Sequence, residues 1–247
     1  MLRFFDCNCM LGRLAAPPPG APDTLDALRE EMRWCGIERG LVCGALAREY
    51  DPGVGNQALV ERLRGQEGLY PCFVLLPPET GEIPFGEELL AQMEQAAARA
   101  ARVFPGHHSH SLHPRCCGRL LGWLEEEHIP LFVDLAETNW DDVGAVCRRF
   151  PDLTLVLLRV GYRIDRQAYP LLEAHPHLCL ETSYYQTHRG IEEVVSRFGA
   201  ERLIFGTGYP FFAPGGPVAA LHYAEISDAD KALIAGGNLA ALLGVRE

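Results

Sequence analysis

Short apolar segments alternate with longer amphipathic segments along the whole chain, and this alternation constrains the fold more than any other feature. Eight apolar segments have the length and composition of buried strands: Leu2–Cys7, Gly40–Gly44, Tyr70–Leu76, Ala101–Phe104, Leu131–Leu135, Leu153–Leu158, Leu178–Thr182 and Arg202–Phe205. Between and after them, apolar residues recur at helical spacing in Thr24–Trp34, Asn56–Arg64, Phe85–Arg99, Cys116–Glu127, Trp140–Arg149, Asp165–Ala174, Ile191–Phe198 and the tail from Ser227 to Leu243. Strict alternation of strands and helices indicates parallel strands joined by right-handed crossovers.

Eight such units fit one (β/α)₈ barrel of the TIM type. The chain has 247 residues, and a barrel of this kind typically needs about 250. The first strand-to-helix joint has no G-x-G-x-x-G pattern, so a dinucleotide-binding doubly wound sheet loses its main support. No repeat or linker divides the chain, and the proline-rich stretch Ala15–Pro22 is expected to form a rigid loop. We therefore predict an α/β protein with a single domain, residues 1–247.

The charge balance and the cysteines limit the partners and the compartment. With 22 Lys+Arg against 33 Asp+Glu, the net charge of −11 argues against nucleic acid or an anionic membrane as partner. No apolar run approaches the roughly 20 residues of a membrane span, and Asp6 and Asn8 interrupt the apolar start of the chain. Nine scattered cysteines are typical of buried thiols in a reducing compartment. The adjacent pair Cys116 and Cys117 lacks the spacing of a zinc knuckle. We expect a cytoplasmic protein with a small-molecule ligand; a homo-oligomer is compatible with the sequence.

Polar residues follow the ends of the predicted strands, where reactive groups of such barrels gather. They are Asp6, Asn8 and Met10 after the first strand, His107, His108, His110 and His113 after the fourth, Asp134 and Glu137 after the fifth, Arg159 after the sixth, Glu181 and Ser183 after the seventh, and Thr207 and Gly208 after the eighth. The sequence therefore predicts a ring of polar side chains at one end of the barrel.

Arg159 is the most informative member of this ring, because it ends an apolar strand. A buried arginine needs a paired anion, and Asp134 on the neighbouring strand would lie about 5 Å away. Asp6 is a second candidate partner. Glu181 alternates with apolar residues, so it is expected to point into the barrel interior, where it is another candidate partner of Arg159.

At these residues the chain resembles the amidohydrolase-related family, TIM-barrel proteins that include decarboxylases and lactone hydrolases. Phe5-Asp6-Cys7-Asn8-Cys9-Met10-Leu11-Gly12 is similar to the family's opening Asp-x-His-x-His-x-Gly segment. Further similarities are Arg102–Pro105, Ile129–Val133, Phe150–Leu153 with Gly161, and Gly199–Arg202. The last are Phe205–Pro210, where the family carries Gly-Ser-Asp-x-Pro, and Gly237-Asn238. The resemblance covers essentially the whole chain and implies a hydrolase or lyase.

The chain departs from this family at the metal ligands. In members that use a divalent metal, two histidines of the first strand, one histidine each after the fifth and sixth strands and an aspartate after the eighth hold the ion. The resemblance places Asn8, Met10, Asp134, Arg159 and Gly208 at these positions. Only Asp134 is an ordinary ligand for such an ion. We therefore expect no cofactor, and we expect Arg159 to take the electrostatic place of a metal such as zinc.

Two groups of side chains leave alternatives open. The segment His107–His113 contains four histidines, which could hold a transition metal or supply a pocket acid or base such as His107, with His108 facing the ligand. His188 could face the pocket or begin the following helix. Tyr184, Tyr185 and Tyr209 offer aromatic walls for a flat ligand, or they pack on the outer helices.

Three functions follow as hypotheses. The first is a hydrolase or lyase that acts without the usual metal on a small carboxylate-bearing molecule, with Asp134, Arg159, His107 and His188 as candidate catalytic residues. In this hypothesis the ligand contacts Asp6, Asn8, Met10, His108, Glu181, Ser183, Tyr185, Thr207 and Gly208. The second is a non-catalytic barrel that binds a ligand or a partner. The third is a metallohydrolase with an atypical site in the histidine segment.

Overall fold

Eight parallel strands form the barrel that the alternation predicts. In the computed structural model, which describes residues 2–19, 21 and 23–245, the strands are β1 (Phe4–Leu11), β2 (Ile37–Gly44), β3 (Leu69–Val74), β4 (Ala101–Val103), β5 (Leu131–Asp134), β6 (Leu155–Leu158), β7 (Leu178–Glu181) and β8 (Leu203–Ile204). Each strand pairs with the next in chain order. The backbone N–H groups of Cys7 and Met10 donate to Phe205 and Tyr209, at 3.0 and 2.9 Å, so the segment after β8 lies against β1. The fold is a nearly closed (β/α)₈ barrel in one domain.

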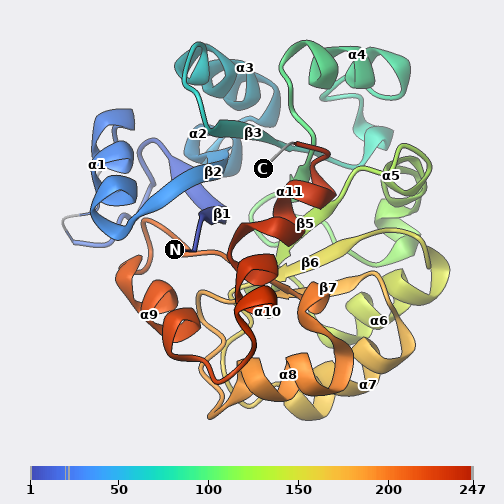
Figure 1. Ribbon diagram of the computed structural model, residues 1–247. Coiled ribbons are helices and arrows are strands. Elements are labelled where there is room, and N and C mark those ends of the chain that lie inside the picture. Colours follow the sequence, from blue (N-terminus) through green and yellow to red (C-terminus); the bar gives the residue numbers. More distant parts are fainter. Residues whose placement is uncertain (1, 20, 22, 246–247) are drawn as a thin grey trace.

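The helices surround the strands as an outer ring (Figure 1). They are α1 (Leu25–Cys35), α2 (Ala45–Glu49), α3 (Pro52–Leu63), α4 (Glu87–Gln95), α5 (Pro114–Glu126), α6 (Trp140–Arg149), α7 (Asp165–Ala174), α8 (Gly190–Phe198), α9 (Gly215–Tyr223), α10 (Asp228–Ala232) and α11 (Asn238–Leu242). Local signals set several boundaries: Thr24 accepts from the N–H of Ala27 at the start of α1, and Gly36 ends it in the left-handed conformation. The sequence did not predict α2 or α9. Part of the expected loop Ala15–Pro22 lies outside the described residues.

The first strand is longer than the sequence indicates, and this places two candidate residues differently. We expected the strand to end at Cys7, because polar residues follow, but β1 continues to Leu11. Asn8 and Met10 are therefore part of the strand and buried. An irregularity between Asp6 and Cys9 interrupts the register with β2 there. Asn8 can be buried because Arg102 and Glu181 form hydrogen bonds with its side chain. The pattern of hydrophobic residues along the sequence does not indicate such long-range bonds.

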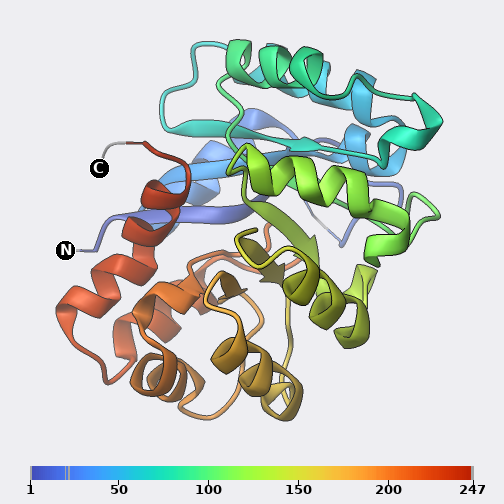
Figure 2. The same cartoon turned by 90° about the vertical axis from the view of Figure 1, so that its right-hand side faces the viewer.

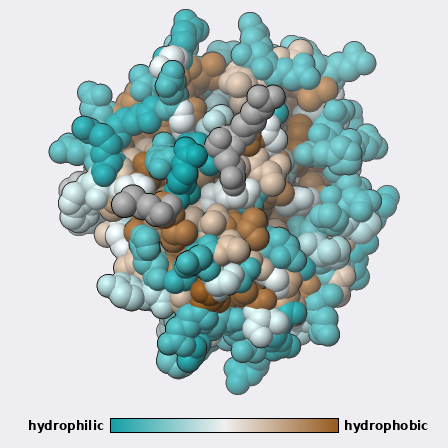
Figure 3. Space-filling view, viewed as in Figure 1, coloured by the Kyte–Doolittle hydropathy of each residue, from teal (hydrophilic) through white to brown (hydrophobic). Residues whose placement is uncertain are grey.

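The barrel has an inner and an outer apolar core. Leu41, Phe132, Val156 and Ile204 are among the side chains that fill the interior. Alternate residues on the same strands pack against the helices. Hydrophobic residues gather near the centre of the face shown in Figure 3, and hydrophilic residues occupy most of its outline. None of the described helices is both long and apolar enough to cross a membrane.

The C-terminal segment covers the end of the barrel where the strands begin. Figures 1 and 2 show α10 and α11 across one end of the strands. Asn238 donates to the carbonyls of Ala200 and Leu203, at 2.8 and 2.9 Å, just before and at the start of β8. Arg99, before β4, donates to the carbonyl of Leu243 at 3.4 Å. The opposite end, where the strands finish, is left for the polar residues.

Candidate functional site at the strand ends

Asp134 and Arg159 form an ion pair at the ends of β5 and β6, as the sequence predicts. Nε and Nη2 of Arg159 both approach Oδ2 of Asp134, while Oδ1 of Asp134 accepts the backbone N–H of Ala136 at 3.0 Å. The Asp134 side chain is fully buried, and that of Arg159 is 19% exposed. The Phe211 ring centroid lies 4.5 Å from Cζ of Arg159. Among the described residues, no side chain or backbone oxygen accepts from Nη1 of Arg159, so this end of the guanidinium is available to a ligand.

The backbone of Arg159 adopts the left-handed conformation, with φ of 49°. For a residue with a side chain this conformation costs about 1–2 kcal/mol. The N–H of Arg159 donates to Oε2 of Glu181 at 2.9 Å, and this bond holds the strained residue in place. Strain of this kind collects at functional sites, where the surrounding structure maintains it. The conformation aims the guanidinium across the strand ends towards Asp134.

Glu181 is fully buried at the end of β7, but its partners differ from the expected one. Its carboxyl group contacts the backbone N–H of Arg159 and not the guanidinium. It also accepts from the N–H and the hydroxyl of Ser183, at 2.6 and 2.8 Å. Burial raises the pKa of Glu181 from 4.5 to about 7, although these hydrogen bonds act in the opposite direction. A Cβ at Gly206 would lie 2.4 Å from Oε1 of Glu181, so only glycine leaves room for this carboxyl group. Glu181 can therefore exchange a proton near neutral pH.

Arg102 is a buried cation that our sequence analysis did not include in the site. It lies on β4 and donates from Nη1 to Oδ1 of Asn8 at 2.9 Å, and the Asn8 amide is 3.5 Å from Oε2 of Glu181. Its Nε is buried without a hydrogen-bond partner among the described residues. Its Cζ lies 4.8 Å from the Phe104 ring centroid. The alternation of Ala100, Arg102 and Phe104 was the available signal, because alternate residues of a barrel strand face the interior.

Asp6 and Thr207 satisfy each other and connect β1 to the segment after β8. The Asp6 carboxylate accepts from the N–H and hydroxyl of Thr207, at 2.9 and 2.5 Å, from the N–H of Asn8 at 2.8 Å and from the thiol of Cys9 at 3.0 Å. Burial raises the pKa of Asp6 above its usual value. Asp6 therefore does not pair with Arg159, which corrects that expectation, while its contact with a ligand stays a prediction. Met10 likewise packs in the inner apolar core.

His107 and His108 lie on another side of the site, beside Arg48 of α2. Nδ1 and the N–H of His107 lie 2.5 and 3.0 Å from Glu137, and Nη2 of Arg48 lies 3.5 Å from His107. Nε2 of His108 is 2.9 Å from the carbonyl of Arg48. Burial lowers the pKa of His108. Arg48 and Arg159 both lie against the Phe211 ring, at 5.8 and 4.5 Å from its centroid. Phe211 thus links the histidine segment to the ion pair.

Gly208 occupies the position at which the resemblance places a metal-binding aspartate, and its surroundings exclude a side chain. Its φ is 69°, and a Cβ there would lie 2.7 Å from the Phe212 ring and 3.1 Å from the Ser183 hydroxyl. Phe212 is stacked on Tyr184, with ring centroids 5.0 Å apart. The space that a ligand from β8 would need is therefore filled by an aromatic pair.

The other residues at these positions do not suit a divalent cation either. The Asn8 amide is engaged with Arg102 and Glu181, and the Asp134 carboxylate with Arg159. Arg159 is itself a permanent cation that repels a metal ion. The side chains at these positions are thus engaged with one another, and the absence of a metal at the strand ends stays a prediction.

His188 and Tyr185 lie apart from the ion pair. Tyr185 is buried in the outer core, and its hydroxyl donates to Asp165 at 3.0 Å and lies 3.3 Å from the Tyr169 hydroxyl. We therefore correct its expected place at the ligand site. His188 is exposed and borders a separate cleft of about 430 Å³ between the segments after β6 and β7. The cleft is lined by Tyr162, Arg163, Asp165, Arg166, Gln186, Thr187 and His188.

The fold and the site define a TIM-barrel protein with its polar groups at the carboxyl ends of the strands. The family model described as amidohydrolase matches residues 9–245, and the chain belongs to this family. It matches no curated protein sequence. An uncharacterised TIM-barrel protein from Bordetella bronchiseptica is 18% identical, covering 98% of this chain and 99% of that chain with a TM-score of 0.78.

Two further solved structures have names that state an activity. The 2,6-dihydroxybenzoate decarboxylase from Rhizobium is 14% identical over 99% of both chains, with a TM-score of 0.76. A putative 2-pyrone-4,6-dicarboxylic acid hydrolase from Pseudomonas putida is 16% identical, covering 99% of this chain and 98% of that chain, with a TM-score of 0.74. At these identities the likeness shows the shared fold.

Proposed function

We propose that the strand ends bind the carboxylate of a small aromatic or unsaturated acid, and that the protein acts on it as a lyase or hydrolase without a divalent metal there. The observation that carries the proposal is the guanidinium of Arg159. Asp134 holds it from one side, the Phe211 ring covers it, and Nη1 has no protein acceptor among the described residues. A planar guanidinium matches the geometry of a carboxylate, and a neighbouring aromatic ring suits a flat ligand.

Glu181 supplies the proton transfer in this proposal. Its pKa of about 7 allows it to donate a proton in one step and to accept one in another at neutral pH. In a decarboxylation, the bond from the ring to the carboxyl carbon breaks, and a proton from Glu181 replaces the departing CO₂. In a hydrolysis, the Glu181 carboxylate accepts a proton from the attacking water. Glu181 is fully buried, so this proton transfer requires its carboxyl group to become accessible to the ligand.

The names of the similar structures support this substrate class. One is a decarboxylase of an aromatic acid, and another is named for the hydrolysis of a pyrone dicarboxylic acid. Both names describe small unsaturated carboxylates.

We also propose a cytoplasmic location. All nine cysteines are free thiols, which is typical of proteins in a reducing compartment.

A non-catalytic binding protein is the second candidate function. The observation in its favour concerns three positions at which the resemblance places metal ligands. Asp134 is paired with Arg159, Asn8 accepts from Arg102, and a side chain at Gly208 would clash with Phe212. Such a protein would bind the acid at Arg159 but would not transform it. Recovery of the unchanged acid after prolonged incubation with the protein separates this function from the first.

A thermal-shift comparison tests the binding proposal. The probes are 2,6-dihydroxybenzoate and 2,6-dihydroxybenzamide, at about pH 6 and pH 8, against wild type and Arg159→Met. The matched control is Arg166→Met, which removes a guanidinium from the separate cleft. We expect the acid to stabilise wild type and the control but not Arg159→Met, and the amide to stabilise none of them. Stabilisation that survives in Arg159→Met and disappears in Arg166→Met would place the ligand in the cleft instead.

A further inference from the structure

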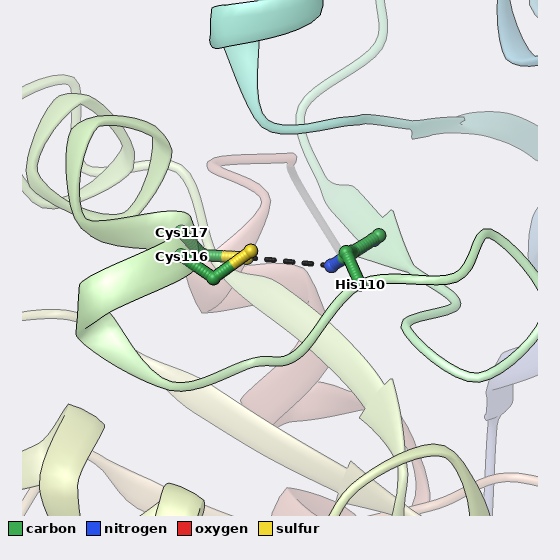
Figure 4. A group of neighbouring side chains, drawn as sticks. All are labelled: His110, Cys116 and Cys117. Atoms are coloured by element: carbon green, nitrogen blue, oxygen red, sulfur yellow. Dashed lines mark hydrogen bonds between the residues drawn. The ribbon is translucent and has the colours of Figure 1, made fainter.

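One histidine of the His107–His113 segment lies beside two cysteines at the start of α5. Figure 4 shows His110 on the segment that follows β4, with its ring directed at Cys116 and Cys117. Nδ1 of His110 is 3.5 Å from Sγ of Cys117, and the ligand atoms of the three residues all lie within 4.8 Å of one another. Among the described residues, this is the group of three histidine, cysteine or carboxylate side chains that is compact enough to share an ion.

The separations match those that a tetrahedral ion imposes on its ligands. With metal–nitrogen and metal–sulfur bonds of about 2.0 and 2.3 Å, a tetrahedral angle places nitrogen and sulfur about 3.5 Å apart and two sulfurs about 3.8 Å apart. The distance between His110 Nδ1 and Cys117 Sγ already has this value. The upper limit of 4.8 Å leaves at most about 1.0 Å of adjustment for the two sulfurs and about 1.3 Å for His110 and Cys116.

The surroundings favour a cation held by two thiolates. Cys116 and Cys117 lie in the first turns of the 13-residue helix α5, where the helix dipole stabilises negative charge. Burial raises the pKa of the Cys117 thiol, and the carboxylates of Glu79 and Asp142 add negative potential there, so a bound cation is needed to hold this thiolate. Apart from Cys117, Nδ1 of His110 contacts the Ser111 carbonyl at the long distance of 3.4 Å, and Nε2 is buried without a hydrogen-bond partner among the described residues. His110 and Cys116 are half-buried, which gives an ion access from solvent.

We propose that His110, Cys116 and Cys117 form a binding site for a thiophilic divalent ion of the zinc type, with solvent as the fourth ligand. Two thiolates and a neutral imidazole are the donors that such an ion prefers, and two negative charges balance its own. The ion joins the segment after β4 to α5. It thereby restrains the segment that holds His107 against Glu137. This site includes neither Asp134 nor Arg159, and the inference does not rest on the function proposed above.

Metal binding to the untagged, reduced full-length protein tests the site with Zn²⁺ and with Co²⁺ as a spectroscopic probe. We expect wild type to retain one equivalent of Zn²⁺ after desalting. We expect Co²⁺ to give the visible bands of a tetrahedral site together with a thiolate-to-metal charge-transfer band. Cys116→Ser and His110→Gln should reduce the retained Zn²⁺ to well below one equivalent and should remove the charge-transfer or tetrahedral signature.

The controls are Cys35→Ser, a half-buried thiol on α1, and His177→Gln, an exposed histidine before β7. Both should bind Zn²⁺ as wild type does. Cys116 and His110 are preferred to the fully buried Cys117, whose replacement would also disturb packing. The proposal is overturned if wild type retains far less than one equivalent, or if Cys116→Ser and His110→Gln retain as much Zn²⁺ as the controls.

Discussion

Arg159 approaches a single oxygen of Asp134 with two of its nitrogens, while the other oxygen of Asp134 accepts the backbone N–H of Ala136. Both oxygens of the aspartate are thus engaged, whereas the structure records no acceptor for Nη1 of Arg159 in the described part of the chain. This asymmetry is the basis of the binding proposal.

Replacing Asp134 is expected to lower the free energy of unfolding more than replacing Arg159. Asp134→Ala leaves a buried cation without its partner and is expected to lower the free energy of unfolding by about 3–5 kcal/mol. Arg159→Met removes the cation, roughly preserves volume and should cost less. Urea titrations of both variants measure the effect, with Asp26→Ala, at an exposed position in the first turn of α1, as control at about 1 kcal/mol or less. Equal losses for Asp134→Ala and Asp26→Ala would contradict a stabilising role of the pair.

Glu181 predicts a specific dependence of stability on pH. Its pKa is about 7 in the folded protein against 4.5 as the reference. Between these values the unfolded chain releases this proton while the folded chain retains it, so the unfolding free energy falls as pH rises, by about 3 kcal/mol in total. Glu181→Gln removes this contribution. The difference between wild type and variant should therefore change between about pH 4.5 and 7, whereas Glu126→Gln, at an exposed position on α5, should follow wild type. A pH-independent difference for Glu181→Gln would be inconsistent with a raised pKa.

Gly208 predicts intolerance of even one methyl group. Gly208→Ala meets both the left-handed backbone and the Phe212 ring, and should destabilise the protein by about 2 kcal/mol or more. Gly216→Ala is the matched control, because a Cβ there meets no atom within 4 Å and lies in α9. The control should be neutral or slightly stabilising. Similar melting temperatures for the two variants would show that the space beside Phe212 is not as restricted as we describe.

Arg102 and Arg202 are both buried, but their partners predict unequal losses of stability on replacement. Arg202 donates to the carbonyls of Leu178, Leu172 and His175. Among the described residues, Arg102 has one hydrogen bond, to Asn8, and a buried Nε without a partner. Arg202→Met should cost about 3 kcal/mol, because three carbonyls lose their donor. Arg102→Met should cost clearly less. A larger loss for Arg102→Met in chemical denaturation would reveal a stabilising role that its contacts do not explain.

The strand ends predict weak metal retention once the His110, Cys116 and Cys117 site is disabled. Cys116→Ser protein exposed to excess Zn²⁺ or Mn²⁺ and then desalted should hold far less than one equivalent by elemental analysis. The reason is that Arg159 and Gly208 stand where family members place ligands, and Asp134 is already paired. One equivalent retained by Cys116→Ser and lost in Cys116→Ser/Asp134→Asn would instead establish a metal at the strand ends and favour metal-assisted hydrolysis.

The sequence by itself determined the barrel, the ion pair and the position of most strand-end residues. Alternating periodicity reports which face of each element is buried, and chain order then leaves few ways to pair parallel strands. Asp134 and Arg159 could be paired in advance because they end neighbouring strands. Their distance along the sheet follows from strand spacing alone.

Tertiary structure alone decided the partners of the remaining polar groups. Glu181 accepts a hydrogen bond from the backbone of Arg159 and not from its guanidinium. Asp6 accepts from Thr207, and Tyr185 packs outside the barrel, where its hydroxyl donates to Asp165. His110 meets Cys116 and Cys117 because an irregular segment folds back onto α5. Hydrogen-bond partners depend on side-chain direction and on loop conformation to within about 1 Å. A one-dimensional pattern of residue types does not encode these distances.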